Sequence, residues 1–252
     1  MVAQISPPSQ PPSVLLAHAG ALKVNREFLR SLSIPQATKT HKPVSHALLV
    51  DYLEESLGFR QMKIVREEFA VTLDGMKCFG LLELNYELKN VRFAIGFRNS
   101  NDKSMRLAMT VGYRVIICDN MAFKGDFTPV LAKHSGKLEL ESLISYGVDK
   151  IQRNFEPLKQ QIDDWMTYPL INSEAKEIIY DAFLNSKLDI PRHLLPKVHK
   201  NYFEPEFEEF RGRNLWSLSN AFTSSFKELA PVKQYQVTAK LGDFIEKNKM
   251  PF

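Results

Sequence analysis

The sequence predicts an α+β fold, in which an antiparallel sheet of about four strands is followed by a helical C-terminal half. Two observations predict this. Apolar residues alternate with small or polar ones between residues 66 and 117, and beyond Gly136 they recur at spacings of three and four. A length of 252 residues suits one large domain or two small ones. We divide the chain into a flexible proline-rich arm (1–43), an α+β sheet core (44–135) and a helical region packed on the sheet (136–252).

The sheet core opens with a helix and a hairpin. Six of the fourteen prolines lie in residues 1–43, which favours a mobile arm there. A helix follows, with Pro43 in its first turn and Gly58 at its left-handed end. The pattern then predicts strands at 66–73 and 76–85, joined by Asp74-Gly75 in a type I′ turn.

Two further strands, 91–98 and 105–117, carry the functional interpretation. Their odd-numbered residues are large and apolar, and these include the aromatic Phe93, Phe97 and Tyr113. Their even-numbered residues are mostly small and are interrupted by arginines. Because side chains alternate across a strand, we expect one buried face and one wet face that presents arginines above a flat floor. The alternative is that the small residues allow a helix to pack closely.

The C-terminal half is predicted to be helical to its end. Apolar residues from Ile144 to Trp165 form a seam, which Pro157 should kink or divide into two helices. Ser173 and Asn214 are expected to cap two later helices, and Val237 to Ile245 mark a last one.

Composition excludes several classes of protein. Hydrophobic residues make up 44% and charged residues 25%, as in globular domains. No apolar run approaches the roughly 18 residues that a membrane span needs, so we expect no membrane partner. Cys78 and Cys118 are the only cysteines, which suits a reducing cytoplasm.

Positive charge gathers on the predicted strands. Between Lys89 and Cys118, six Lys or Arg residues face one acid, Asp102. Such a local field attracts polyanions, and nucleic acid is the partner that we predict. The expected phosphate-binding residues come from the even-numbered strand positions and from the polar turn between the strands: Arg92, Arg98, Asn99, Ser100, Lys103, Ser104, Arg106 and Arg114. The alternative is a solvated strand face.

Motifs for catalysis are weak. The eleven glycines are scattered and the six histidines are widely spaced, so we predict no cofactor, no metal site and no catalytic residue. One pattern remains open: Asp74 followed by Glu87 and Lys89 has the order that metal-dependent nucleases use to hold Mg²⁺.

Two signatures resemble a bacterial family known as domain of unknown function nine-three-two, whose members are called phage- or plasmid-like proteins. The resemblance spans roughly residues 48–229 and implies a mobile element in a bacterial host, without a reaction or catalytic residues. The first signature comprises Gly96 to Ser100, Asp102 to Ser104, Gly112, Val115 to Met121 and Phe123; the second comprises Leu215-Trp216 and Asn220 to Thr223.

A fold-level analogy points to recombination. A hairpin, two antiparallel strands with a basic face and helices behind them resemble the core of single-strand annealing proteins, although those place a helix after the third strand. We therefore predict a non-enzymatic protein that binds or anneals single-stranded DNA. The alternatives are a protein-interaction module, such as a defence inhibitor or assembly factor that forms oligomers or holds a partner through its helical region, and a Mg²⁺-dependent nuclease.

Overall fold

The computed structural model describes residues 21–116, 118, 120–123, 130–136, 138–185, 188–229 and 231–249. Over these residues the fold is α+β, as predicted, but its antiparallel sheet has seven strands rather than about four. The strand order is β1-β2-β3-β4-β5-β6, and β7 also pairs with β5. The strands are β1 (Ala21–Val24), β2 (Ile64–Thr72), β3 (Lys77–Leu88), β4 (Val91–Ser100), β5 (Leu107–Val115), β6 (Asn120–Phe123) and β7 (Val130–Ala132).

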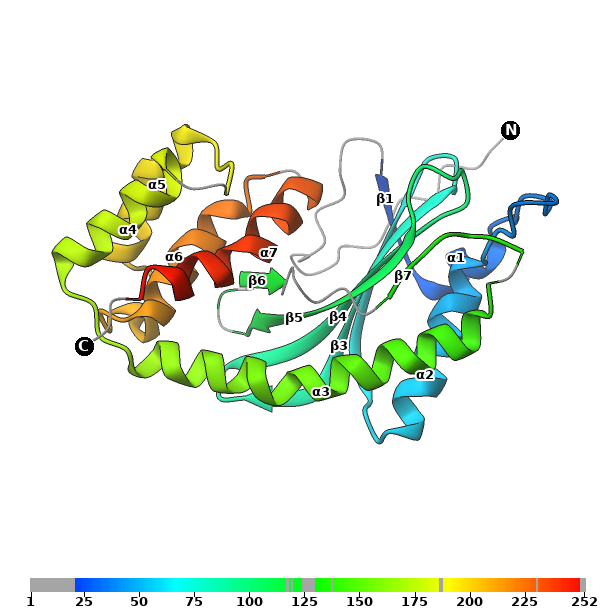
Figure 1. Ribbon diagram of the computed structural model, residues 1–252, viewed down its shortest axis with the longest axis horizontal. Coiled ribbons are helices and arrows are strands. Elements are labelled where there is room, and N and C mark those ends of the chain that lie inside the picture. The colour runs from blue at the N-terminus through cyan, green and yellow to red at the C-terminus, as the bar shows by residue number, and fades with distance from the viewer. Residues whose placement is uncertain are drawn as a thin grey trace.

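Helices lie mainly in the C-terminal half of the chain. In Figure 1, α3 runs along the sheet, α4 to α7 gather beside β6, and α1 and α2 lie towards the opposite end of the molecule. The α-helices are α1 (Arg26–Ser31), α2 (His46–Phe59), α3 (Leu140–Thr167), α4 (Asn172–Leu184), α5 (Leu195–Phe203), α6 (Leu215–Phe226) and α7 (Pro231–Lys247), with short 3₁₀ turns η1 (Arg192–Leu194) and η2 (Glu208–Phe210).

Part of the predicted N-terminal arm belongs to the folded domain. Strand β1 pairs with β2 at the edge of the sheet, and Leu29 of α1 is buried in the core. The Asn25 side chain accepts a hydrogen bond from the Phe28 amide and so caps α1. The prediction of a flexible arm therefore fails for residues 21–31, and residues 1–20 lie outside the described part of the chain.

The two predicted turns form with different geometry. Helix α2 runs through Gly58, whose φ is not positive, and the left-handed residue that follows the helix is Gln61. In the β2–β3 hairpin only Gly75 has a positive φ, whereas a type I′ turn needs positive φ at both central residues. The connection is a longer one, in which the Asp74 carboxylate accepts a hydrogen bond from the Met76 amide.

The sheet has the two faces that the alternation predicts. The odd-numbered residues of β4 and β5 point into one large apolar core together with α2, α3 and the later helices. We call this the core face, and we call the opposite side of the sheet the second face. Register places Phe79 of β3 opposite Arg98 and Arg98 opposite Ala108, so odd positions of β3 share the second face with even positions of β4 and β5.

Helix α3 is continuous through Pro157, so of the two predicted outcomes, a kink or a division into two helices, the division does not occur. Phe155 and Leu158, on either side of the proline, are both buried in the core. Their packing offsets the cost of the proline, which is about 3 kcal/mol in a helix interior. Of the predicted caps, Asn214 accepts a hydrogen bond from the Ser217 amide, whereas Ser173 lies inside α4 and Ile171 precedes that helix.

Candidate nucleic-acid interface

The middle of the second face contains a buried ion cluster centred on Glu83. Glu83 has 0% exposure, and its Oε2 lies 2.7 Å from Arg114 Nη2 and 3.6 Å from Arg92 Nη1. Its Oε1 lies 3.7 Å from Arg66 Nε, and Arg92 also donates to Glu87 across 2.7 Å. Arg92 and Arg114 were expected to bind phosphate. In the structure both arginines are paired with carboxylates instead, because a buried carboxylate needs cationic partners.

The floor around this cluster is closed rather than open. Leu81, Ala94 and Met121 form a small apolar cluster on the second face, and Phe123 packs against it. A Cβ added to Gly96 would lie 2.7 Å from the Phe123 ring, so the small residue there accommodates an aromatic side chain. The predicted flat floor without bulky side chains is therefore wrong for the middle of the face.

Asn99 points into the core face and does not reach the surface. Its Nδ2 donates to the Val44 carbonyl and to His46 Nδ1, and its Oδ1 accepts from His134 Nε2 at 2.7 Å. Burial lowers the pKa of His46 and of His134, which suits neutral rings that make these bonds. Asn99 joins the segment before α2 to the sheet and is removed from the expected interface.

The two serines of the predicted site hold the β4–β5 turn together. Ser100 is buried and donates to the Asp102 carboxylate, and Ser100 Oγ lies 3.2 Å from Ser104 Oγ. The Ser104 amide donates to the same carboxylate. Although burial opposes the change, these bonds and Lys77 hold the pKa of Asp102 well below its usual range. The hydroxyl groups thus have partners within the turn, as local polar turn residues commonly do.

Three of the cations among the eight predicted residues lie accessible and without an ion pair to a described residue at one end of the second face. Lys103 and Arg106 are exposed and Arg98 is half-buried, and none of them forms an ion pair with a described residue. The Arg98 Nε is buried without a hydrogen-bond partner among the described residues. These three cations lie where the β2–β3 and β4–β5 turns meet, because the Asn101 amide donates to the Met76 carbonyl.

Two further cations, missed in the sequence, lie on the same end of this face. Lys77 is paired with Ser100 across β3 and β4, and its Nζ lies 3.2 Å from Asp102 Oδ2. Lys133 follows the paired residues Leu107 and Ala132, which places it beside Arg106. Lys77 was detectable only from the β3–β4 register and Lys133 only from the short strand β7. We call the resulting group the hairpin-end patch: Lys77, Arg98, Lys103, Arg106 and Lys133.

The structure does not bring together the three residues of the nuclease pattern, Asp74, Glu87 and Lys89. Asp74 lies in the β2–β3 turn, whereas Glu87 lies near the other end of β3, which spans about 30 Å of strand. Glu87 binds Arg92, and Lys89 Nζ lies 3.0 Å from Asp163 of α3. Asp74 and Glu87 therefore cannot share one metal ion. Within the described residues no group of three or more His, Cys, Asp or Glu could hold a metal.

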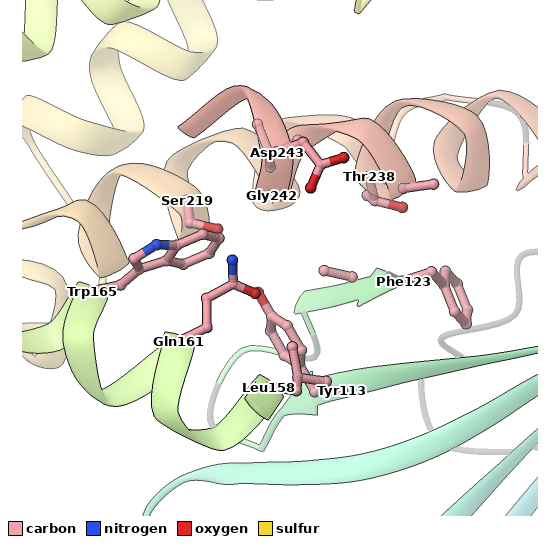
Figure 2. Close-up of a pocket in the computed structure, with 12 residues that line it drawn as sticks. Tyr113, Phe123, Leu158, Gln161, Trp165, Ser219, Thr238, Gly242 and Asp243 are labelled. Atoms are coloured by element: carbon pink, nitrogen blue, oxygen red, sulfur yellow. The ribbon is translucent and has the colours of Figure 1, made fainter. Parts of the chain in front are cut away.

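A pocket opens between the sheet end and the C-terminal helices. Figure 2 shows Tyr113 of β5 beside Gln161 of α3, Trp165 of α3 on one side and Phe123 of β6 at the far side, with Ser219 of α6 and Asp243 of α7 above. Burial raises the pKa of Tyr113 to about 12, so its hydroxyl stays protonated. The described lining residues include no His, Cys, Lys or Arg.

Comparisons with known proteins add no identification. No family model, no curated protein and no solved structure matches the chain. The resemblance to the phage- and plasmid-like family therefore stays a prediction. Among the described helices, none combines the length and the apolar character that crossing a membrane requires.

Proposed function

We propose that this protein binds single-stranded DNA without catalysis, and that the hairpin-end patch holds its phosphates. The observation that carries the proposal is the contrast between the two ends of one sheet face. In the middle, Arg66, Arg92 and Arg114 surround the buried Glu83. At the hairpin end, five cations accompany two turn carboxylates, Asp74 and Asp102, and four of the five cations form no ion pair with a described residue.

The chemistry of the patch suits a backbone ligand. Guanidinium and ammonium groups donate charge-assisted hydrogen bonds to phosphate oxygens, and they do so without reading base edges. Such contacts release counterions, so affinity falls as salt concentration rises. A role in annealing or recombination on a phage, prophage or plasmid in the bacterial cytoplasm would follow from the resemblance and remains part of the proposal.

The protein-interaction alternative loses one of its supports. A partner could dock on the apolar seam from Ile144 to Trp165 only if that seam exceeded what the protein's own core needs. In the structure the seam residues are at most 3% exposed and belong to the protein's own core. The proline-rich segment that also motivated this alternative lies mostly in residues 1–20, outside the described part of the chain.

The experiment measures binding of a labelled 30-nucleotide oligonucleotide by fluorescence anisotropy between 50 and 200 mM NaCl. Removing two phosphate contacts with Arg98→Ala/Arg106→Ala should weaken binding and make the slope of log affinity against log salt shallower by about 1.4. The matched control is Arg153→Ala/Lys200→Ala, which removes the same charge from exposed positions of α3 and α5.

The proposal predicts that the control keeps the wild-type slope. It is overturned if wild-type protein binds no oligonucleotide, or if the patch variant and the control lose equal affinity. In the second case net charge rather than this surface would account for binding.

A further inference from the structure

The hairpin end of the second face carries two parallel rows of side chains that differ in chemistry. The outer row holds Lys77, Arg106 and Lys133, with the buried Ser100 between the first two. The inner row lies two residues further along each strand, and its members are paired in register: Phe79 with Arg98, Arg98 with Ala108, and Ala108 with Leu131. The rows therefore run across the strands, one basic and one largely apolar.

The two large apolar residues of the inner row, Phe79 and Leu131, are partly exposed to solvent, and beyond Phe79 the row continues through the buried Ala70 of β2 to Lys23 of β1. Phe79 is half-buried beside Arg98, and Leu131 is 50% exposed beside Ala108. Among described residues no aromatic partner contacts the Phe79 ring. The row thus has an aromatic side chain on β3 and an aliphatic one on β7, separated by Arg98 of β4 and Ala108 of β5.

The spacing of the rows fits one nucleic-acid strand. Two residues along a β-strand cover about 6.6 Å, and neighbouring strands lie about 4.8 Å apart. These distances are of the size that separates a phosphate from its own base and one nucleotide from the next. A strand that crosses the sheet with its phosphates on the outer row and on Arg98 would carry bases over the apolar residues of the inner row, Phe79 and Leu131.

We propose that the inner row is a base-stacking platform, in which Phe79 stacks on one base while Leu131, three strand spacings or about 14 Å further across the sheet, contacts a base farther along the same nucleic-acid strand. This inference rests on the proposed binding of single-stranded DNA and specifies how the same surface selects its ligand. Bases in a duplex are already stacked and paired, so they cannot reach Phe79. The platform therefore favours single strands over duplexes, and it tolerates any base because every base has a π-face.

The first test compares ligands and a truncation. Phe79→Ala should lower the affinity for a 30-nucleotide single strand about 5- to 150-fold, the range expected for loss of one stacked base. Its salt slope should equal that of wild-type protein, since no charge is removed. An abasic oligonucleotide of the same length should bind wild-type protein more weakly and should bind Phe79→Ala equally weakly. Leu22→Ala, at an exposed residue of edge strand β1, is the matched control and should bind like wild type.

The second test uses Phe79→Trp, which keeps an aromatic ring at this position. It therefore does not require that the protein stay folded when the Phe79 ring is removed. The two native tryptophans, Trp165 and Trp216, are 3% and 5% exposed, so they report little on a surface ligand. In Phe79→Trp the added indole should be quenched by the single strand and not by the abasic oligonucleotide.

The outcomes separate the two proposals. If wild-type protein binds single strands with a slope that depends on Arg98 and Arg106, but Phe79→Ala binds normally, the platform is wrong and the backbone site stands. The platform alone is also overturned if wild-type protein binds duplex or abasic strands as tightly as it binds the intact single strand. The same holds if the indole of Phe79→Trp is not quenched by the single strand. Failure of wild-type protein to bind any strand overturns the proposed function itself.

Discussion

At the scale of single residues, Glu83 has the greatest structural importance of the ionisable groups on the second face. It is fully buried and is the shared partner of Arg66, Arg92 and Arg114 from three different strands. A buried ion pair adds little net stability by itself, but removing one partner leaves the other charges buried and uncompensated. Arg66 and Arg92 would keep Glu68 and Glu87 as partners, so the loss of Glu83 falls mainly on Arg114, whose side chain is 6% exposed.

Glu83→Gln should accordingly lower the free energy of unfolding by about 3 to 5 kcal/mol, measured by urea denaturation at pH 7. The matched control is Glu87→Gln, because Glu87 also binds Arg92 but is largely exposed, and it should cost no more than about 1 kcal/mol. Equal effects of the two substitutions would contradict the central role of Glu83.

Individual site residues were predictable only to the level of strand parity. Alternation correctly placed Phe93, Phe97 and Tyr113 in the core and Arg98 on the opposite face. It could not reveal that Arg114 meets Glu83, because that contact depends on the register of two strands that are far apart in sequence. The prediction placed Asn99 in the polar turn after the strand. Asn99 instead lies within β4, where its odd-numbered position puts its side chain on the core face.

At the scale of elements, close packing between α3 and the sheet depends on a glycine. A Cβ added to Gly147 would lie 2.4 Å from Val130 Cγ2 of β7 and 3.5 Å from Met109 Cε of β5. Valine is stiff about χ1 and cannot simply turn away. Gly58, in the last turn of α2, instead has no atom within 4 Å of an added Cβ.

Replacing each of these two glycines with alanine should therefore have opposite effects on the stability of the protein. Gly147→Ala should destabilise the protein by about 1 to 3 kcal/mol, because overpacking exceeds the gain in helix propensity. Gly58→Ala should stabilise it by about 0.5 to 1 kcal/mol, because only the propensity changes. Thermal or urea denaturation of both variants gives the comparison. A stabilising Gly147→Ala would show that α3 is not held against β7 as described.

Long, periodic elements were predictable and short ones were not. Helices α2, α3, α6 and α7 and strands β2 to β5 follow from apolar spacing over nine or more residues. Strands β1, β6 and β7 have three or four residues, which is too few for a period to appear in the sequence. Their strand structure depends on pairing with β2 and β5, and for this reason the sheet is larger than predicted.

At the scale of the whole molecule, the sheet and the helices share one core. A single apolar cluster includes Leu29 near one end of the chain and Ile245 near the other. The Tyr113 and Trp216 rings lie 5.8 Å apart, and Asn120 of β6 donates to Asn220 of α6. The division at residues 135 and 136 therefore marks a change in secondary structure within one apolar core.

We predict that the two halves unfold in one cooperative transition. Both tryptophans, Trp165 and Trp216, lie in helices, so their fluorescence reports on the helical half. Cys78 of β3 is fully buried, and burial raises the pKa of its thiol, so it reacts with a thiol reagent only after the sheet opens. In a Cys118→Ser background, Cys78 is the single cysteine of the chain.

We expect that when Cys78 is labelled by a short pulse of thiol reagent, the urea concentration at half-maximal labelling coincides with the urea midpoint of the fluorescence change. Fluorescence midpoints of the Cys118→Ser variant and of wild-type protein should also agree, which checks that the background substitution is silent. Labelling of Cys78 at a lower urea concentration would mean that the sheet opens while the helices remain folded. The hairpin-end patch would then lie in a part of the protein that unfolds before the helices. The positions of its cations would then depend on the sheet alone and not on the core shared with the helices.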